Sequence, residues 1–247
     1  SGAIDFFGKF KMSVIKKVKV LIFGTALMAL QPAVALDWRE FANFARYSEA
    51  NEQLLERVKI SDRIVFMGDS ITEGWSHFDP KMFQGTGFVN RGIGGETTPQ
   101  MLLRFRSDVI ALDPDAVVVL AGINDIAGNT GFASVEEIAG NVIAMAELAA
   151  ANDITVLLCS VLPASDFPWS PGLEPAPKVK ALNHLIKAYA EEEGHRYVDY
   201  YSATVDDQGG LRVPQFTRAD DLVHPNIAGY KVMEALVRPA IISALLE

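Results

Sequence analysis

Residues Ile64 to Trp75 read I-V-F-M-G-D-S-I-T-E-G-W, and this stretch decides how the rest of the chain is interpreted. Four consecutive apolar residues predict a buried strand, and the Gly68-Asp69-Ser70 sequence predicts the turn that leaves the sheet. Ser70 therefore stands at the carboxyl end of a strand, the edge where open α/β sheets bind ligands. A Ser in an ordinary polar turn is the alternative. As a nucleophile, Ser70 needs a base, a carboxylate that orients the base, and donors for an oxyanion.

The body of the chain alternates strands and helices. Strands like Val117 to Leu120 are apolar on both faces, which is typical of a parallel sheet covered by helices on each side. Five strands are expected, at Ile64 to Met67, Gly87 to Asn90, Ala116 to Ala121, Ile154 to Val161 and Arg196 to Tyr200. The pattern therefore predicts one α/β domain with a parallel sheet.

Helix signals fill the segments between the strands. We expect an amphipathic helix from Asp37 to Arg57 and a helix that begins at Thr98-Pro99. Ser134 and Glu137 form a capping box for another helix. The last two helices are expected from Lys178 to a stop at Gly194, and from Asn226 towards the end, with a bend at Pro239.

The N-terminal 35 residues resemble a targeting segment. Lysines after Met12 are followed by the apolar run Val20 to Leu30 and by Ala33-Val-Ala35, which is the order of a secretory signal with its cleavage site. Residues 1–11 precede Met12 and are interpreted as an expression remnant. We expect cleavage near Ala35, an exported protein in the periplasm or outside the cell, and no stable membrane anchor; a permanent anchor is the alternative. An uncleaved apolar run is expected to dock on a neighbouring copy, giving a homo-oligomer.

Charge excludes one class of partner. The chain carries a formal net charge of −9, and its N-terminal 35 residues hold five Lys against one Asp. The remaining body is therefore more acidic still, at −13. Because an acidic surface repels phosphate backbones, nucleic acid is not an expected partner.

A candidate base and its orienting acid lie together late in the sequence. Asp221-Leu-Val-His224 directly precedes Pro225-Asn226, where the last helix begins, so one loop presents a carboxylate and an imidazole. His224 is the candidate general base for Ser70, and Asp221 the candidate group that fixes its tautomer. An ordinary surface turn and half of a metal site are the alternatives. The chain has no further His or Cys cluster to complete a metal site, so no metal is expected.

Two more loops follow strands at the same sheet edge. Asn90-Arg-Gly-Ile-Gly-Gly-Glu-Thr-Thr98 carries glycines that let backbone N–H groups approach a ligand, or that simply form a tight turn. In Gly122-Ile-Asn124-Asp125, the Asn124 amide is a candidate donor to an oxyanion, with an ordinary local turn as the alternative. Together the four loops supply the components of acyl-transfer chemistry.

These four segments resemble the sequence blocks of the SGNH subgroup of GDSL esterases and lipases. The resemblance runs from about Arg63 to the end of the last helix, and implies an SGNH hydrolase domain at residues 36–247. It implies a flavodoxin-like three-layer α/β/α sandwich, a catalytic set of Ser70, Asp221 and His224, and no cofactor. It also implies an oxyanion hole formed by Ser70, Gly95 and Asn124, with Gly92 and Gly94 in the same block as Gly95.

The resemblance is strongest to the branch that holds platelet-activating-factor acetylhydrolase-like enzymes and bacterial carbohydrate acetylesterases. It implies short acyl esters, acetyl foremost, in a small molecule or a glycan. Trp75 and Trp169 are candidate substrate contacts, as sugar-stacking surfaces or walls of an acyl pocket, and Trp75 is alternatively a core residue. Trp169 lies in the proline-rich loop Pro163 to Pro177, which leaves the fourth strand at the same edge as Ser70. A lysophospholipase or thioesterase of longer chains and a catalytically idle binding module are the alternative functions.

Overall fold

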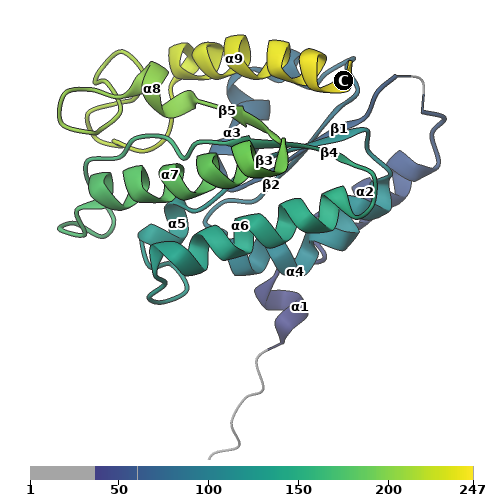
Figure 1. Ribbon diagram of the computed structural model, residues 1–247, viewed down its shortest axis with the longest axis horizontal. Coiled ribbons are helices and arrows are strands. Elements are labelled where there is room, and N and C mark those ends of the chain that lie inside the picture. Colours follow the sequence, from purple (N-terminus) through teal and green to yellow (C-terminus); the bar gives the residue numbers. More distant parts are fainter. Residues whose placement is uncertain (1–36, 60, 247) are drawn as a thin grey trace, which may run out of the picture. The chain divides into compact units, whose positions relative to one another are not determined.

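A computed structural model of the protein describes residues 37–59 and 61–246, and its centre is a five-stranded parallel sheet (Figure 1). The strands follow the order β2-β1-β3-β4-β5, which is the flavodoxin-like order with the chain reversing direction beside β1. Their bounds are Ile64–Gly68 for β1, Phe88–Gly92 for β2, Ala116–Leu120 for β3, Thr155–Cys159 for β4 and Arg196–Val198 for β5. The expected α/β class and parallel sheet are confirmed.

The interior strands β1 and β3 are apolar because both of their faces are covered. Every residue of β1 and β3 is buried, and the two strands pair in parallel from Ile64 opposite Ala116 to Gly68 opposite Leu120. On its other side β1 pairs with β2 from Ile64 opposite Phe88. All five strands therefore end at one edge, and the loops that follow them meet there.

Helices cover both faces of this sheet and complete a three-layer sandwich (Figure 1). One layer holds α3 (Ser70–Phe78), α8 (Tyr200–Thr204) and α9 (Ile227–Leu245). The other holds α2 (Ser48–Leu55), α4 (Thr98–Asp108), α5 (Ile123–Ile126), α6 (Val135–Ala150) and α7 (Pro175–Glu193). The short elements α1 (Trp38–Phe41), η1 (Pro80–Met82) and η2 (Ile110–Leu112) lie in the connections.

Most of the expected helix ends are confirmed. Ser134 and Glu137 form the capping box of α6, Gly194 ends α7 in the left-handed conformation at φ 73°, and the Asn226 side chain caps α9. Helix α9 continues through Pro239. The cap of α4 differs by one residue, because Thr97 and not Thr98 is its N-cap and shares a capping box with Gln100.

The single helix expected from Asp37 to Arg57 is wrong. The segment forms α1 and α2 instead, with a break in which Asn43 has a left-handed φ of 52°. Tertiary contacts explain the break: the Asn43 amide donates to Glu96 Oε1 at 3.0 Å, and the Tyr47 hydroxyl donates to the Gly92 carbonyl. A continuous helix would carry these side chains away from the loop that follows β2.

The last strand is shorter than expected. β5 ends at Val198, and Tyr200, expected as its last residue, begins helix α8. The Asp199 side chain accepts from the Ser202 backbone N–H at 2.9 Å and so caps this helix. Asp199-x-x-Ser202 is therefore the start of a helix, although the residues around it have the pattern of a strand.

The expectations for residues 1–35 lie outside the described residues. The signal segment, cleavage near Ala35, the domain boundary there and the oligomer formed through Val20 to Leu30 therefore stay predictions. Among the described residues, no helix has the length and apolar character needed to cross a membrane.

Gly92, at the end of β2, packs closely against the start of helix α3. A Cβ at this position would lie 2.7 Å from the Asp69 carbonyl oxygen and 2.7 Å from the Thr72 carbonyl carbon, and closer still to the Glu73 nitrogen. Because all three are backbone atoms of the turn into α3, Gly92→Ala should lower the free energy of unfolding by about 1–3 kcal/mol. Urea titration of the purified protein measures this.

Gly140→Ala is the matched control. Gly140 is exposed in α6, and a Cβ there meets no atom within 4 Å. Alanine should therefore raise the stability by about 0.5–1 kcal/mol through helix propensity. Equal stabilities of the Gly92→Ala and Gly140→Ala proteins would contradict the close packing of α3 against β2.

Candidate active site

Ser70 lies where the buried strand β1 passes into helix α3. β1 ends at Gly68, Asp69 is the N-cap of α3, and Ser70 is the first helical residue. The Asp69 carboxylate accepts from the Ile71 backbone N–H at 2.9 Å, which satisfies one of the free donors of the first turn. The predicted position of Ser70 at the carboxyl end of a strand is confirmed.

His224 and Asp221 reach Ser70 across 154 residues of sequence. The Ser70 Oγ lies 2.9 Å from His224 Nε2, and His224 Nδ1 lies 2.8 Å from Asp221 Oδ1. The same Asp221 oxygen accepts from the His224 backbone N–H at 2.9 Å. Thr217 donates its hydroxyl to the His224 carbonyl at 2.8 Å, which holds the loop in place. The three residues that the sequence singled out are thus joined in one chain of hydrogen bonds.

The electrostatics of the two nearby carboxyl groups differ. Burial raises the pKa of Asp221, but the hydrogen bonds from the backbone and imidazole of His224 lower it by more, so the net shift is downward. Asp221 is therefore a carboxylate at neutral pH. Burial raises the pKa of Asp69 to about 7, because one backbone N–H and the nearby His224 only partly offset the loss of water.

The loop after β2 leaves one backbone N–H without a partner. From Gly92 to Thr98, every backbone N–H except that of Gly95 has an acceptor among the described residues: Asn90 Oδ1 for Gly92, the Gly68 carbonyl for Ile93, Glu73 Oε2 for Gly94, the Ile93 carbonyl for Glu96, Gln100 Oε1 for Thr97 and Asp125 for Thr98. Gly95 also has a φ of 78°, a conformation that favours glycine. Among the glycines of this loop, Gly95 is therefore the one with a donor to offer.

Asn124 is held beside that loop by a second asparagine. The Asn124 Nδ2 donates to the Glu96 carbonyl at 3.0 Å, which leaves its second hydrogen free. Asn129, in the turn after α5, donates from Nδ2 to Asn124 Oδ1 at 3.1 Å and to the Gly95 carbonyl at 3.0 Å. A single amide therefore fixes Gly95 and Asn124 relative to each other.

Buried charged side chains hold the loop after β2 in place, and they were not identified from the sequence. Arg104 is fully buried and pairs with Glu96 at 2.6 Å and with Asp108 at 2.9 Å. Asp125 is also buried and accepts from the Thr98 backbone N–H at 2.9 Å and from its hydroxyl at 2.6 Å. Burial raises the pKa of Asp125 above its ordinary value. The available signal was Arg104 and Asp108 at i,i+4 spacing on the apolar face of α4.

The two tryptophans have different surroundings. Trp169 is 49% exposed, and its ring centroid lies 6.2 Å from that of His224, so the loop Pro163 to Pro177 reaches the site. Trp75 is only 1% exposed and packs edge-on against Phe66 in the core. The expected substrate contact of Trp75 is thus corrected, because a ring covered by neighbouring aromatic residues cannot meet a ligand.

Possible metal ligands are not grouped together in the part of the chain that the structure describes. Within residues 37–59 and 61–246, no three His, Cys, Asp or Glu side chains are grouped as metal ligands. The chemistry available from these residues is that of a hydroxyl hydrogen-bonded to an imidazole.

Comparison with protein families gives one match over most of the described chain. Residues 66–232 match the family model described as GDSL-like lipase/acylhydrolase. This range begins in β1, includes Ser70, Gly95, Asn124, Asp221 and His224, and ends in α9.

Individual relatives agree with this match. An acetylxylan esterase from Geobacillus stearothermophilus is 26% identical over 210 residues, which cover 72% of this chain and 92% of that protein. The crystal structure of a GDSL-like lipase from Bacteroides thetaiotaomicron is 48% identical with a TM-score of 0.79, and the match covers 83% of this chain and 99% of that one. The solved structure of a Geobacillus stearothermophilus acetylxylan esterase, at 21% identity and a TM-score of 0.58, covers 73% of this chain and 94% of that one, and shows the shared fold alone.

Proposed function

The chain belongs to the GDSL-like lipase/acylhydrolase family and is an ester hydrolase, and from this premise we propose that it cleaves short-chain carboxylic esters with Ser70 as the nucleophile. The hydrogen bond of 2.9 Å between Ser70 Oγ and His224 Nε2 is the observation that carries the proposal. A binding module has no use for such a pair, so hydrolysis is favoured over an idle binding role.

In the proposed reaction His224 moves the protons. As Ser70 Oγ attacks the ester carbonyl carbon, His224 Nε2 takes its proton, and the imidazolium is stabilised by Asp221 at 2.8 Å. When the carbon–oxygen bond to the alcohol breaks, the imidazolium returns that proton to the leaving oxygen. A water molecule then attacks the acyl-enzyme and gives a proton to His224. As the bond between the acyl carbon and Ser70 Oγ breaks, the imidazolium passes this proton to Oγ, so the acid leaves and the Ser70 hydroxyl is restored.

The proposed oxyanion hole combines three donors. The Ser70 N–H lies in the first turn of α3, where backbone N–H groups have no helical acceptor. The Gly95 N–H is unpartnered among the described residues of its loop, and Asn124 Nδ2 has one hydrogen left after its bond to Glu96. Donors held in place before the reaction stabilise the transition state without reorganising, which is the usual source of most of the rate.

We propose acetyl groups on carbohydrate as the main substrate class. Support comes from the acetylxylan esterase relative, which is 26% identical and matches over nearly its full length. Trp169 adds support, because a half-exposed indole beside His224 offers the flat apolar face on which a sugar ring stacks. The ester bond would then lie between Trp169 and Ser70.

A cavity favours a second candidate, hydrolysis of longer acyl chains. It has a volume of about 280 Å³, and its lining includes Asp125, which follows Asn124 in the sequence, and mostly apolar side chains such as Ile126, Phe132 and Ile138. An acyl chain that leaves the oxyanion hole on this side would find an apolar wall. Such a site fits a lysophospholipase or thioesterase.

Acyl-chain length separates the two candidates. We expect kcat/KM for p-nitrophenyl acetate to exceed that for p-nitrophenyl octanoate by tenfold or more, as an order-of-magnitude estimate, because the acetyl candidate leaves the cavity empty. A preference for octanoate would favour the second candidate. Hydrolysis of neither ester, by a folded protein, would contradict both.

Removal of the nucleophile or base tests the mechanism. Ser70→Ala and His224→Ala should each lower kcat for p-nitrophenyl acetate by about four orders of magnitude or more, and the double variant should lose little further, because the two groups act as one unit. His77→Ala is the control, since His77 is exposed on α3 and, among the described residues, has a ring contact with Phe78 and no side-chain hydrogen bond. Near-normal turnover by Ser70→Ala would rule out the mechanism.

The hydrogen bonds from Asn129 to Gly95 and Asn124 allow a test of the proposed oxyanion hole. Asn124→Ala should lower kcat by about 100- to 1,000-fold with little change in KM, and Asn129→Ala by up to about 100-fold, through misplaced donors. In the Asn124→Ala background, Asn129→Ala should cost less than it does in the wild type, because one of the groups it positions is gone. Asn152→Ala, at an exposed helix end, is the control. Fully additive losses would show that Asn129 does not act through Asn124.

A further inference from the structure

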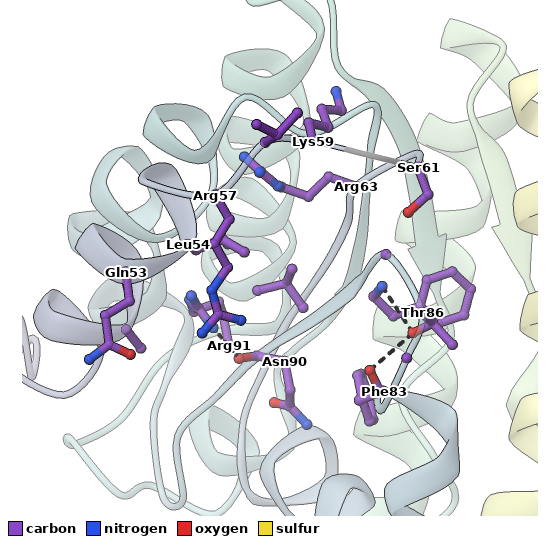
Figure 2. Close-up of a pocket in the computed structure, with 16 residues that line it drawn as sticks. Gln53, Leu54, Arg57, Lys59, Ser61, Arg63, Phe83, Thr86, Asn90 and Arg91 are labelled. Atoms are coloured by element: carbon purple, nitrogen blue, oxygen red, sulfur yellow. Dashed lines mark hydrogen bonds between the residues drawn. The ribbon is translucent and has the colours of Figure 1, made fainter.

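A second cavity lies at the sheet edge formed by β2, away from Ser70 (Figure 2). Its volume is about 570 Å³, within the range of small-molecule sites. The lining comes from the end of α2, from residues just before β1, and from the turn before β2 and β2 itself. The lining does not include Ser70, Asp221 or His224.

The lining is basic in an acidic protein. Of its 16 residues four are cationic, namely Arg57, Lys59, Arg63 and Arg91, and none is Asp or Glu. The whole chain has 31 acidic against 22 basic residues, so a surface of this composition runs against the average of the chain. We call these four side chains and their cavity the basic pocket.

Two of the four cations are buried without a carboxylate partner. Arg63 is 7% exposed and Arg91 is 5% exposed, and neither forms an ion pair with any described residue. The Arg63 guanidinium donates to the Leu112 carbonyl. Buried arginines are normally paired, since an uncompensated charge is costly away from water.

Arg91 has only neutral partners. Its Nε donates to Asn51 Oδ1 at 2.8 Å, its Nη1 donates to the Asn90 carbonyl at 2.7 Å, and its guanidinium carbon lies 4.7 Å from the centre of the Tyr47 ring. Nη2 has no partner among the described residues. Burial lowers the pKa of Arg91; Asp108 and Tyr47 oppose this shift, and the nearby cations Arg104 and Arg63 add smaller effects in the same direction as burial.

The remaining two cations differ. Lys59 pairs with Asp115 at 2.7 Å, so its charge is already compensated. Arg57 is exposed, and its guanidinium has no hydrogen-bond or ion-pair partner among the described residues. Figure 2 shows its side chain extending along the pocket wall towards the level of Arg91 and Asn90. The pocket lining therefore holds an exposed cation without a carboxylate partner as well as buried ones.

A count of the adjoining charges gives the excess. Arg91 connects through Asn51 to Asp108, which pairs with Arg104, and Arg104 pairs with Glu96. This set thus holds four guanidinium groups, those of Arg57, Arg63, Arg91 and Arg104, and two carboxylates, while Lys59 and Asp115 offset each other. An excess of two positive charges remains at the basic pocket.

We infer that the basic pocket binds an oxyanion of two negative charges, of the phosphate or sulfate class, either free or carried by a small organic molecule. Guanidinium groups bind such oxygens through paired N–H donors, which suits the unused donors of Arg57 and Arg91. The apolar side chains of Leu54, Phe83 and Val89 line much of the rest of the pocket, and they fit a neutral body attached to the anion.

Binding to the full chain is measured by calorimetric titration and by thermal unfolding. Inorganic phosphate, sulfate and glucose 6-phosphate are each compared with sodium chloride at equal ionic strength. Phosphate and sulfate should raise Tm beyond the effect of chloride, since a ligand that binds the folded state alone stabilises it. Tighter binding of glucose 6-phosphate than of inorganic phosphate would identify an organic ligand, and the reverse a free anion. No stabilisation beyond that of chloride by any of the three would overturn the inference.

Variants of Arg57 locate the binding. Arg57→Gln should weaken phosphate binding by about tenfold or more with the unliganded Tm little changed, because Arg57 is exposed and its guanidinium forms no hydrogen bond or ion pair with the described residues. Arg57→Glu should remove the response to phosphate and give a higher unliganded Tm than Arg57→Gln, since it supplies a carboxylate to the excess cations. Arg106→Gln, an exposed cation on α4, is the control and should bind as the wild type does. Wild-type binding by Arg57→Gln would overturn the inference.

Discussion

The structure depends on one fully buried arginine. Arg104 on α4 pairs with Glu96 in the loop after β2 and with Asp108 on its own helix, and it donates to the carbonyl of Arg91 at 2.9 Å and that of Gly68 at 3.4 Å. One side chain thus joins a helix, the ends of two strands and a loop. Removing one member of such a buried network typically costs about 3–5 kcal/mol, because the remaining charges stay buried without partners. The loop is therefore fixed before any substrate arrives.

This rigidity explains how the donors of the site keep their places. Glu96, held by Arg104, presents its carbonyl to Asn124, and Asn129 ties Asn124 back to Gly95. A comparable contact joins the other half of the site: Tyr230 of α9 packs on Trp75 of α3 with ring centroids 5.6 Å apart, and its hydroxyl donates to the Ile71 carbonyl at 2.9 Å. Because His224 directly precedes α9 and Ser70 begins α3, the packing of these two helices brings base and hydroxyl together.

The sequence predicts those features that local chemistry decides. The apolar runs of β1 and β3, the turn at Ser70, the Asp221-x-x-His224 pair and the capping box at Ser134 all carry their own signal within a few residues. Features decided by distant contacts are not predictable in this way. The break at Asn43 depends on Glu96, and the burial of Trp75 depends on α9. From the sequence, Gly95 is preferred to Gly92 and Gly94 as the oxyanion donor through the family resemblance alone. In the structure, the N–H groups of Gly92 and Gly94 already donate to Asn90 and Glu73.

The buried network around Arg104 also positions residues of the basic pocket. Asn51 accepts from Arg91 at 2.8 Å and donates to Asp108 at 2.8 Å, so the guanidinium at the pocket and the carboxylate that pairs with Arg104 share one amide. The Arg91 backbone carbonyl is in turn bound by Arg104. This network therefore holds more cations than carboxylates. Its carboxylates lie towards the loop after β2, and its excess cations lie at the basic pocket. An anion in that pocket would complete the charge balance of the network that also positions Glu96, and thus would stabilise the fold from outside the catalytic site.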